Sequence, residues 1–330
     1  MLTKIKSLFK IESKINSLSK QVKALEDKLE SKVETNTQLI LQLKAKLEEK
    51  SSEEKLLLGT LASSITRLAD NVPNLQSTEF KVFSQWGDDG IIQYLLSQIE
   101  IPIKTFIEFG VENYTESNTR FLLMHNNWSG LIMDGSLDNI KYVKNDSIYW
   151  KYNLKAKTAF VTAENINDLI VEEGIQGEIG ILHIDIDGND YWIWKNVNAV
   201  NAAIVIVEYN SVFGADRAVT IPYQKDFIRS KAHYSNLYYG TSLLSLCDLA
   251  EEKGYYFVGC NSAGNNAYFV RKDKIGELHP ISCQDGYVLS QFRESRDKSG
   301  ALTFLTGEKR INEIEGLDVF NTRSNMLEKF

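Results

Sequence analysis

Four short apolar runs in the sequence each end in a carboxylate, and these acids are the side chains best placed to carry chemistry. The runs close at Glu108, Asp134, Asp185 and Glu208. An apolar run of about four to six residues that ends in Gly, Asp or Asn is typical of a strand buried on both faces of a parallel sheet. Ligands of such sheets bind beyond the carboxyl ends of the strands. We therefore expect the four acids to converge on one crevice.

The first two acids have the spacing of a nucleotide-type cofactor site. Gly110 follows Glu108 by two residues, and a glycine lets the backbone approach a bound ligand closely. Asp134 comes about 25 residues later, where a carboxylate can bond both hydroxyls of a ribose. Each acid can equally cap the helix that follows its strand, and both interpretations stay open.

The other two acids belong to the densest polar region of the sequence. Residues 183–191 contain three aspartates, and Asn210 follows Glu208 by two residues. Neighbouring parallel strand ends lie about 5 Å apart, so acids at both ends repel each other unless a proton or a cation intervenes. Oxygen ligands suit Mg²⁺ or Ca²⁺. In the alternative, residues 187–190 are a tight turn that caps a helix without a metal, and Asp185 or Asp187 is the general base.

The long segment at residues 211–241 has the composition of an acceptor-binding insertion. It contains Arg217 and several aromatic residues, which suit a sugar or nucleotide-sugar acceptor, with Arg meeting a phosphate. His233 lies in this segment and is a candidate base, whereas His183 is expected in the core of its strand. The alternative is an aromatic loop that packs on the sheet. Near the end of the chain, residues 292–297 either face the active site or form a surface ion-pair network.

Strand-like and helix-like segments alternate from residue 80 onward, and they must position these side chains. Helices are expected at residues 88–99, 117–126, 136–144, 165–173, 190–197 and 242–253. Two strands around a Gly/Asn turn are expected between residues 255 and 270. The alternation predicts the α/β class, with a doubly wound, mixed seven-stranded sheet.

The Glu108/Gly110 loop, followed by Asp134, Asp185 and Glu208 at successive strand ends, resembles the class I S-adenosylmethionine-dependent methyltransferases. The nearest likeness is to the FkbM-type and macrocin-O-methyltransferase-type enzymes, over about residues 80–275. The resemblance implies a Rossmann-like methyltransferase fold with S-adenosylmethionine as its cofactor. It implies cofactor contacts by Ser84, Gln85, Glu108, Gly110, Asn118, Asp134, Ser136 and Asn165.

The loop after Gly110 departs from the family pattern in one respect. Loops of the family carry further glycines, whereas Glu112, Asn113 and Thr115 follow Gly110 here. We therefore expect a different turn. This departure also leaves open a catalytically silent scaffold that keeps a methyltransferase-like domain.

The same resemblance implies a divalent cation, Mg²⁺ or another, held by Asp185, Glu208 and Asn210, with Asp187 or Asp190 as a substitute ligand. Such an ion lowers the pKa of a substrate hydroxyl, and methyl transfer then needs only alignment and a deprotonated nucleophile. The implied reaction is O-methylation of a sugar or another small hydroxylated acceptor, in surface polysaccharide or glycolipid biosynthesis. A metal-dependent hydroxylase on the same fold is the alternative enzyme.

The beginning of the chain has the composition of a long exposed helix. It has no aromatic residue between Phe9 and Phe80 and no proline before Pro73. Apolar residues recur at coiled-coil spacing in two columns. The columns are Leu8, Ile15, Val22, Leu29 and Leu43, and Ile11, Leu18, Leu25 and Leu39. Asn36 and Lys32 interrupt them, and we expect the helix to form a homo-oligomer.

The bulk properties predict a cytoplasmic protein. The net charge is -7, although residues 1–58 carry twelve Lys against nine acids, and an acidic body argues against nucleic acid as a partner. Three scattered cysteines indicate a reducing compartment. Leu2, Ile5 and Leu8 alternate with lysines, an arrangement that fits contact with the inner face of a membrane.

We expect three parts in the chain. They are a coiled-coil oligomerisation segment at residues 1–72, a methyltransferase domain at residues 73–280 and a C-terminal extension at residues 281–330. The shift in composition at residues 71–74, where aromatic residues begin to appear, marks the first boundary.

Overall fold

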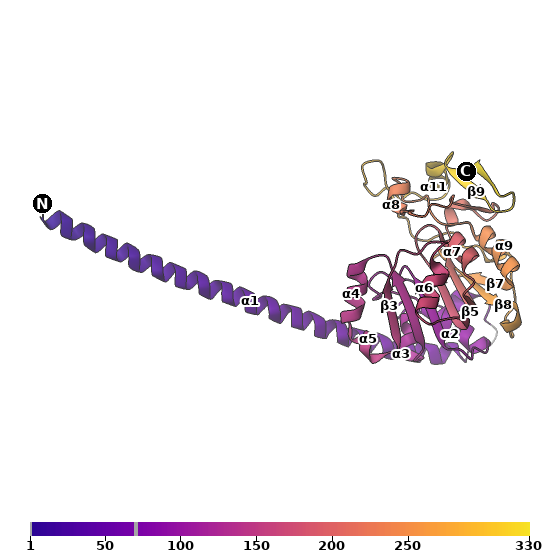
Figure 1. The fold of residues 1–330 in the computed structure, drawn as a ribbon, viewed down its shortest axis with the longest axis horizontal. Helices are drawn as coiled ribbons and strands as arrows, with labels where there is room; N and C mark the ends of the chain where they lie inside the picture. The colour runs from indigo at the N-terminus through magenta and orange to yellow at the C-terminus, as the bar shows by residue number, and fades with distance from the viewer. Residues whose placement is uncertain (1, 69–71) are drawn as a thin grey trace. The chain divides into compact units, whose positions relative to one another are not determined.

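The computed structural model describes residues 2–68 and 72–330, and it divides into a stalk, Met1–Leu57, and a body, Leu58–Phe330 (Figure 1). The stalk belongs to helix α1 (Leu2–Thr66). Its residues are good helix formers, with no glycine or proline before Gly59. The long N-terminal helix is therefore confirmed. The side chains of residues 2–8, on which the expected membrane contact rests, lie outside those described.

A seven-stranded sheet forms the centre of the body, in the order β3-β2-β1-β4-β5-β8-β7. Five strands run parallel, and β8 is antiparallel to both of its neighbours. The strands are β1 (Thr105–Phe109), β2 (Ser129–Asp134), β3 (Leu154–Thr158), β4 (Gly177–Ile184), β5 (Val200–Glu208), β7 (Tyr255–Cys260) and β8 (Asn266–Arg271). This order confirms the predicted mixed, doubly wound sheet, and it places the four acid-ended strands side by side.

Helices cover both faces of the sheet, and each face has its own apolar cluster. Phe106 and Ile107 are adjacent in β1 but belong to different clusters, because alternate side chains of a strand point to opposite faces. Residues of α6 (Ile166–Glu172), α7 (Asp190–Asn196) and α9 (Leu243–Lys253) pack in the cluster of Ile107. Residues of α2 (Asp88–Gln98), α3 (Arg120–His125), α4 (Leu137–Asn145) and α5 (Ser147–Lys151) pack in the cluster of Phe106.

The C-terminal residues and the segment after β5 share a third apolar cluster, which includes Phe213, Phe227 and Val319. A small sheet in the order β10-β9-β6 joins them. Its strands are β6 (Val219–Thr220), β9 (Asp318–Asn321) and β10 (Met326–Lys329), accompanied by α8 (Arg229–Ala232), α10 (Cys283–Gly286) and α11 (Glu308–Ile314). Three short 3-10 helices, η1 (Leu75–Thr78), η2 (Ser211–Phe213) and η3 (Lys272–Lys274), complete the body. In Figure 1 these C-terminal elements lie beyond one end of the large sheet.

None of the helices in the described ranges is both long enough and apolar enough to cross a lipid bilayer.

Candidate active site

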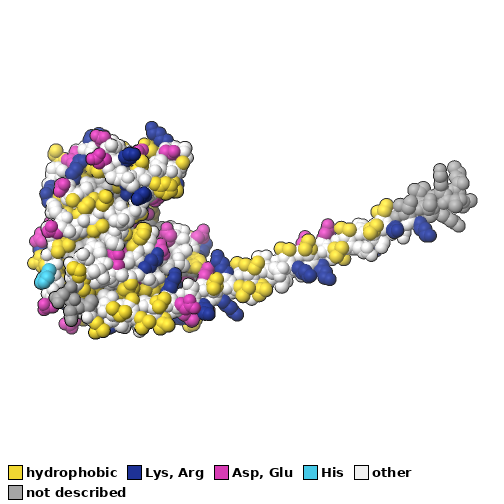
Figure 2. Space-filling view, turned by 180° about the vertical axis from the view of Figure 1, so that it is seen from behind, with side chains coloured by type: hydrophobic (Ala, Val, Ile, Leu, Met, Phe, Trp, Pro, Cys, Tyr) yellow, Lys and Arg dark blue, Asp and Glu magenta, His cyan; other side chains and the backbone are white. Residues whose placement is uncertain are grey.

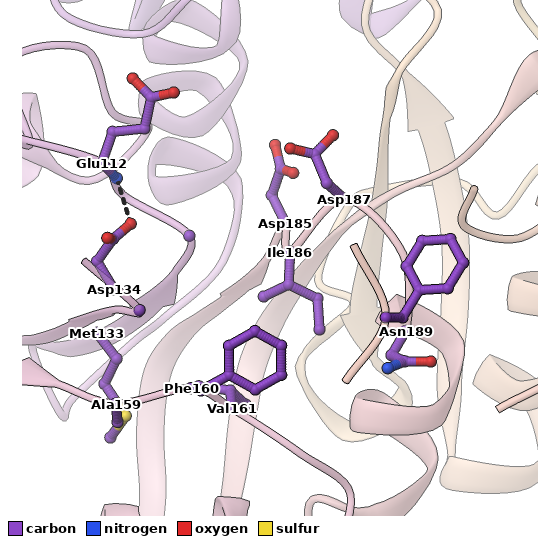
Figure 3. Close-up of a pocket in the computed structure, with 13 residues that line it drawn as sticks. Glu112, Met133, Asp134, Ala159, Phe160, Val161, Asp185, Ile186, Asp187 and Asn189 are labelled. Atoms are coloured by element: carbon purple, nitrogen blue, oxygen red, sulfur yellow. Dashed lines mark hydrogen bonds between the residues drawn. The ribbon is translucent and has the colours of Figure 1, made fainter. Parts of the chain in front are cut away.

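Two adjoining cavities lie at the carboxyl ends of β1, β2 and β4. The first has a volume of about 210 Å³. The side chains or backbone of residues from these strand ends surround it (Figure 3). Its lining residues are Gly110, Glu112, Met133, Asp134, Gly135, Ala159, Phe160, Val161, Asp185, Ile186, Asp187, Asn189 and Phe227. The space-filling view shows the body hollowed between its sheet layer and the C-terminal elements (Figure 2).

The second cavity, of about 400 Å³, is bounded mainly by the segment after β5. Arg229, Ser230 and Asn236 from that segment line it, together with Glu294 from the C-terminal part of the chain. Four residues line both cavities, namely Phe160, Ile186, Asp187 and Phe227. The two spaces therefore meet at the end of β4.

The loop after β1 has the backbone conformation that glycines favour, although only its first residue is a glycine. Gly110, Glu112 and Tyr114 all have positive φ, at 73°, 49° and 62°. Glycine adopts such angles without steric cost, whereas other residues rarely do. Glu112 and Tyr114 therefore keep a left-handed conformation although neither is a glycine.

Gly110 is required for a second reason, which is its distance from β4. A Cβ atom on this residue would lie 1.7 Å from the backbone oxygen of Asp185. Such an overlap is impossible without moving one strand end away from the other. The absent side chain thus lets the loop after β1 lie against the loop after β4, at the wall of the first cavity.

The Asp134 carboxylate lines the first cavity and also fixes the loops around it. One oxygen accepts a hydrogen bond from the backbone N–H of Glu112 at 2.9 Å (Figure 3). The other accepts from the backbone N–H of Ser136 at 2.8 Å and from the Asn139 side chain at 3.0 Å. Ser136 itself caps α4. Asp134 is therefore a cavity residue that also positions Ser136, the residue that caps α4, whereas the alternative interpretation made Asp134 itself the cap.

Glu108 lies under the cavity rather than in its wall. Its carboxylate accepts hydrogen bonds from the hydroxyls of Ser117 and Thr119 and from the backbone N–H groups of Asn118 and Thr119. His183 donates to it at 2.9 Å, and the Asn118 amide lies 3.2 Å from the other ring nitrogen. Glu108 thus holds residues 117–119, at the end of the loop after β1, in place.

Burial opposes ionisation of both members of the Glu108–His183 pair, but their mutual interaction outweighs it. The pKa of Glu108 is held below its usual range by the imidazole and the neighbouring hydroxyls, despite burial. The pKa of His183 is raised by the carboxylate, again despite burial. His183 is buried, as expected of a core histidine. This pair is a structural element of the site.

Three carboxylates converge beside the cavities. Asp185, Asp190 and Glu208 each offer an oxygen within 4.8 Å of the others. Asp190 accepts from the backbone N–H groups of Ile186 and Gly188, so it closes the turn after β4. Glu208 is buried, and its Oε2 has no hydrogen-bond partner among the described residues. A buried, unpaired carboxylate oxygen facing other acids has the chemistry of a cation ligand or of a protonated acid.

The ionisation of this trio is strongly disfavoured. Burial first, and then the charge of Asp187, raises the pKa of Asp185 to about 7. Burial raises the pKa of Asp190 to about 6, despite its backbone hydrogen bonds. Burial and the neighbouring aspartates raise the pKa of Glu208 well above its usual range. A proton or a cation is therefore favoured among the three.

Arg229 lines the second cavity and pairs with Asp187. Its Nη1 lies 2.6 Å from an oxygen of Asp187, and its Nε donates to the backbone oxygen of Asn236 at 3.0 Å. Its guanidinium carbon lies 3.7 Å from the centroid of the Tyr239 ring, and Nη2 lies 3.9 Å from Glu294. These contacts hold the guanidinium in one orientation at the cavity wall.

Several expected site residues lie outside the lining of both cavities. Ser84 is buried, and its hydroxyl donates to Asp89, while Gln85 contributes only its backbone oxygen to a described hydrogen bond, from Lys81. Asn165 donates to the backbone oxygen of Phe160 and so fixes the loop that carries this ring. The Asn210 amide is used within the fold, because its Nδ2 donates to the backbone oxygens of residues 237 and 239 and its Oδ1 accepts from the backbone N–H of residue 212.

His233 contacts Ser235, with its Nδ1 2.7 Å from the hydroxyl oxygen, and it lines neither cavity. Burial holds its pKa below the usual range. Arg217, expected at a phosphate, instead pairs with Glu328 at 2.7 Å and lies over the ring of Phe330.

Sequence reasoning missed Phe227, Arg229 and Asn189 as cavity residues. Asn189 lies in the turn predicted at residues 187–190, but no role was given to it. Phe227 and Arg229 lie in the segment at residues 211–241, where other residues were named instead. Residues 292–297 were treated as facing either the site or solvent, and the structure places Glu294 in the wall of the second cavity.

No protein-family model and no curated protein match the sequence. Solved structures with low identity are similar to it. One is an S-adenosylmethionine-dependent methyltransferase from Clostridium acetobutylicum, with 11% identity and a TM-score of 0.36, over 56% of this chain and 90% of that one. Another is the O-methyltransferase from Bacillus cereus in complex with SAH, with 13% identity and a TM-score of 0.34, over 67% of this chain and 91% of that one.

The N-terminal domain of EvdMO1 in the presence of SAH and D-fucose is also similar, with 11% identity and a TM-score of 0.33, over 51% of this chain and 75% of that one. The strand order of the large sheet, and not these likenesses, defines the fold as Rossmann-like.

Proposed function

We propose that this protein is an S-adenosylmethionine-dependent methyltransferase that binds its cofactor in the first cavity. The observation that carries the proposal is the wall formed by Gly110, the left-handed loop after it and Asp134. Met133, Phe160 and Val161 give the same cavity an apolar side, which suits an adenine ring next to the ribose-binding carboxylate. S-adenosylmethionine, when bound, supplies the methyl group as an electrophile.

The acceptor would bind in the second cavity, which meets the first at Asp187. Asp185 lines the first cavity two residues before Asp187 and is the proposed general base, because its pKa of about 7 lets it take a proton from a hydroxyl near neutral pH. Asp187 is the other candidate, but its ion pair with Arg229 favours a role in holding the guanidinium. His233 is the weaker candidate, since it lines neither cavity.

A divalent cation also fits the acidic trio, and Asp185, Asp190 and Glu208 would hold it, with Asp185 then a ligand in place of the base. The unpaired oxygen of Glu208 supports this set. Asp190 takes the place first given to Asn210, whose amide is used within the fold. A cation there would lower the pKa of an acceptor hydroxyl.

A neutral hydroxylated acceptor, such as a sugar, suits the second cavity better than a nucleotide-sugar. Arg229 is already paired with Asp187, and Glu294 adds a further acid. A phosphate would therefore meet more negative than positive charge. A place in polysaccharide or glycolipid assembly on the cytoplasmic side is part of the proposal and rests on the family resemblance alone.

The test is the affinity for S-adenosylhomocysteine, measured by titration calorimetry, of the Asp134→Ala variant. We expect at least about a tenfold loss, since one carboxylate contact to a ribose is worth more than about 1.4 kcal/mol. Asp138→Ala is the matched control, because that side chain is exposed and pairs with Lys141 at 3.4 Å. Equal affinities of the two variants and the parent would overturn the proposal.

A further inference from the structure

One column of helix α1 keeps a seven-residue spacing well beyond its first half. The column comprises Leu8, Ile15, Val22, Leu29, Asn36, Leu43, Lys50 and Leu57. In its first half, a companion column lies three residues after each member, at Ile11, Leu18 and Leu25. The next companion at this spacing is Lys32, which would put a charge into the seam.

Beyond Leu29 a second companion column begins, four residues after each member instead of three. It comprises Val33, Ile40, Leu47, Glu54 and Leu61. The change produces one eleven-residue interval from Val22 to Val33 within the seven-residue pattern. Such an interval locally unwinds a left-handed supercoil without breaking the helix. The seam shifts by one residue, and Lys32 then lies beside it.

The side chains of the shifted column are exposed in the single chain. Val33 is 56% exposed, Ile40 64% and Leu47 70%. The column continues in the sequence to Leu61, which belongs to the body and is 56% exposed. Leu57 of the first column, the last residue of the stalk, is 63% exposed. A stripe of this length, unburied by its own chain, is typical of a helix that packs against another helix.

We propose that α1 packs against α1 of a second copy of this chain, as a parallel two-stranded coiled coil whose seam uses Val33, Ile40 and Leu47 in its second half and extends to Leu57 and Leu61. Ile15 and Val22 in one column, with Leu18 and Leu25 in the other, are the pattern that favours two strands. The interface therefore reaches the body and is independent of the reaction proposed for it.

The charges that flank the seam disfavour an antiparallel arrangement of the two helices. Glu12 and Glu26 lie on one side of the first half, and Lys14 and Lys28 on the other. In an antiparallel pair, the glutamate side of one helix faces the glutamate side of the other, and the lysine sides also face each other, so like charges would meet. In a parallel pair, the glutamate side of one helix faces the lysine side of the other. A parallel pair in register also places Asn36 against Asn36, where two amides can bond each other.

The test compares disulfide formation in three full-length variants, Ile40→Cys, Leu61→Cys and Leu39→Cys, each carrying Cys247→Ser to remove the half-exposed native thiol. Leu39 is the matched control, because it belongs to the seam only if the spacing does not shift. With oxidised glutathione as oxidant, we expect the Ile40→Cys and Leu61→Cys chains to form covalent dimers at least about tenfold faster than the Leu39→Cys chain.

Each other outcome contradicts a stated part of the proposal. Faster cross-linking at residue 39 than at residue 40 would show an unshifted seam, and cross-linking at 40 without 61 would show that the seam stops before the body. Light scattering of the unmodified chain must give twice 37.5 kDa, and a monomer mass would overturn the interface altogether. Melting curves of the variants verify that the body stays folded.

Discussion

At the scale of single residues, burial has opposite outcomes for two acids that end neighbouring strands. Glu108 is surrounded by donors and by the His183 imidazole, so its pKa lies below the usual range although it is buried. Asp185 has acids around it, and burial together with Asp187 raises its pKa to about 7. The first acid is therefore a fixed charge of the scaffold, and the second can exchange a proton near neutral pH.

The raised pKa of Asp185 predicts a pH-dependent effect of the Asp185→Asn substitution on stability. The folded state binds the proton more tightly than the unfolded one, so this group lowers the free energy of unfolding as the pH rises from about 4 to about 7. At pH 8, we expect Asp185→Asn to raise the free energy of unfolding by at least about 1 kcal/mol, and at pH 5 to change it little.

Urea denaturation at both pH values measures this difference. Asp138→Asn, at an exposed position, is the control and should leave the stability unchanged at either pH. An equal effect of Asp185→Asn at pH 5 and pH 8 would contradict the shifted ionisation.

The close approach of Gly110 to the end of β4 predicts a large effect of a single methyl group. We expect Gly110→Ala to lower the free energy of unfolding by about 3 kcal/mol or more, because the new Cβ meets the Asp185 oxygen at 1.7 Å and φ is 73°. Gly135→Ala is the matched substitution in the same cavity, since its Cβ would lie 3.5 Å from the Phe160 ring, an ordinary contact. We expect a change within about 1 kcal/mol there.

Thermal melting and urea denaturation distinguish the two glycine variants. Comparable losses in both would mean that the tight contact between the loop after β1 and the end of β4 does not limit the substitution.

The sequence identified the acids of the site better than the surfaces that enclose it. Asp134 and Asp185 were found because a buried strand must end where they stand, and backbone periodicity is readable from a single sequence. Phe227 and Arg229 come from a segment without periodicity, so their place depends on tertiary packing alone. The side-chain oxygen of Asn210 is of the type that binds metal ions, so the sequence suggested a ligand. Its hydrogen bonds to the backbone oxygens of residues 237 and 239 depend on the fold and could not be predicted.

At the scale of elements, strands buried on both faces were predicted and the exposed edge strand was not. β3 (Leu154–Thr158) contains Lys155 and Lys157 and is only partly buried, so it lacks the continuous apolar run of the central strands. Lys155 donates to the backbone oxygen of Glu173, and Lys157 donates to the carboxylate of Glu172. Edge strands commonly carry such lysines. The lysines interrupt the apolar pattern from which a strand is predicted, so the sequence did not reveal β3.

Helix α3 begins at Arg120, three residues later than the expected start at Ser117. The intervening residues do not enter the helix because their hydroxyls and backbone N–H groups bond to Glu108. Their polar composition fits a helix cap, but its acceptor belongs to another strand. The boundary was therefore set by a tertiary contact and could not be read from local composition.

At the scale of the whole molecule, the C-terminal residues are integrated into the body rather than appended to it. β9 pairs with β6 from the segment after β5, and Val319 packs with Phe213 and Phe227. Because Phe227 lines both cavities, the end of the chain supports the floor of the candidate site.

This arrangement predicts that Val319→Ala lowers the free energy of unfolding of the body by about 1 to 2 kcal/mol, because the side chain is fully buried. Leu327→Ala on the same small sheet is the control, since Leu327 is 62% exposed and its loss should cost less than about 0.5 kcal/mol. Chemical denaturation followed by tyrosine and tryptophan fluorescence measures both. Equal costs would show that the small sheet does not depend on the shared cluster.

The left-handed residues of the loop after β1 also affect how such loops can be detected. Gly110, Glu112 and Tyr114 all have positive φ, which glycine adopts without steric cost, yet only one of the three residues is a glycine. A motif search that counts glycines therefore passes over this loop, because the left-handed residues at positions 112 and 114 are not glycines.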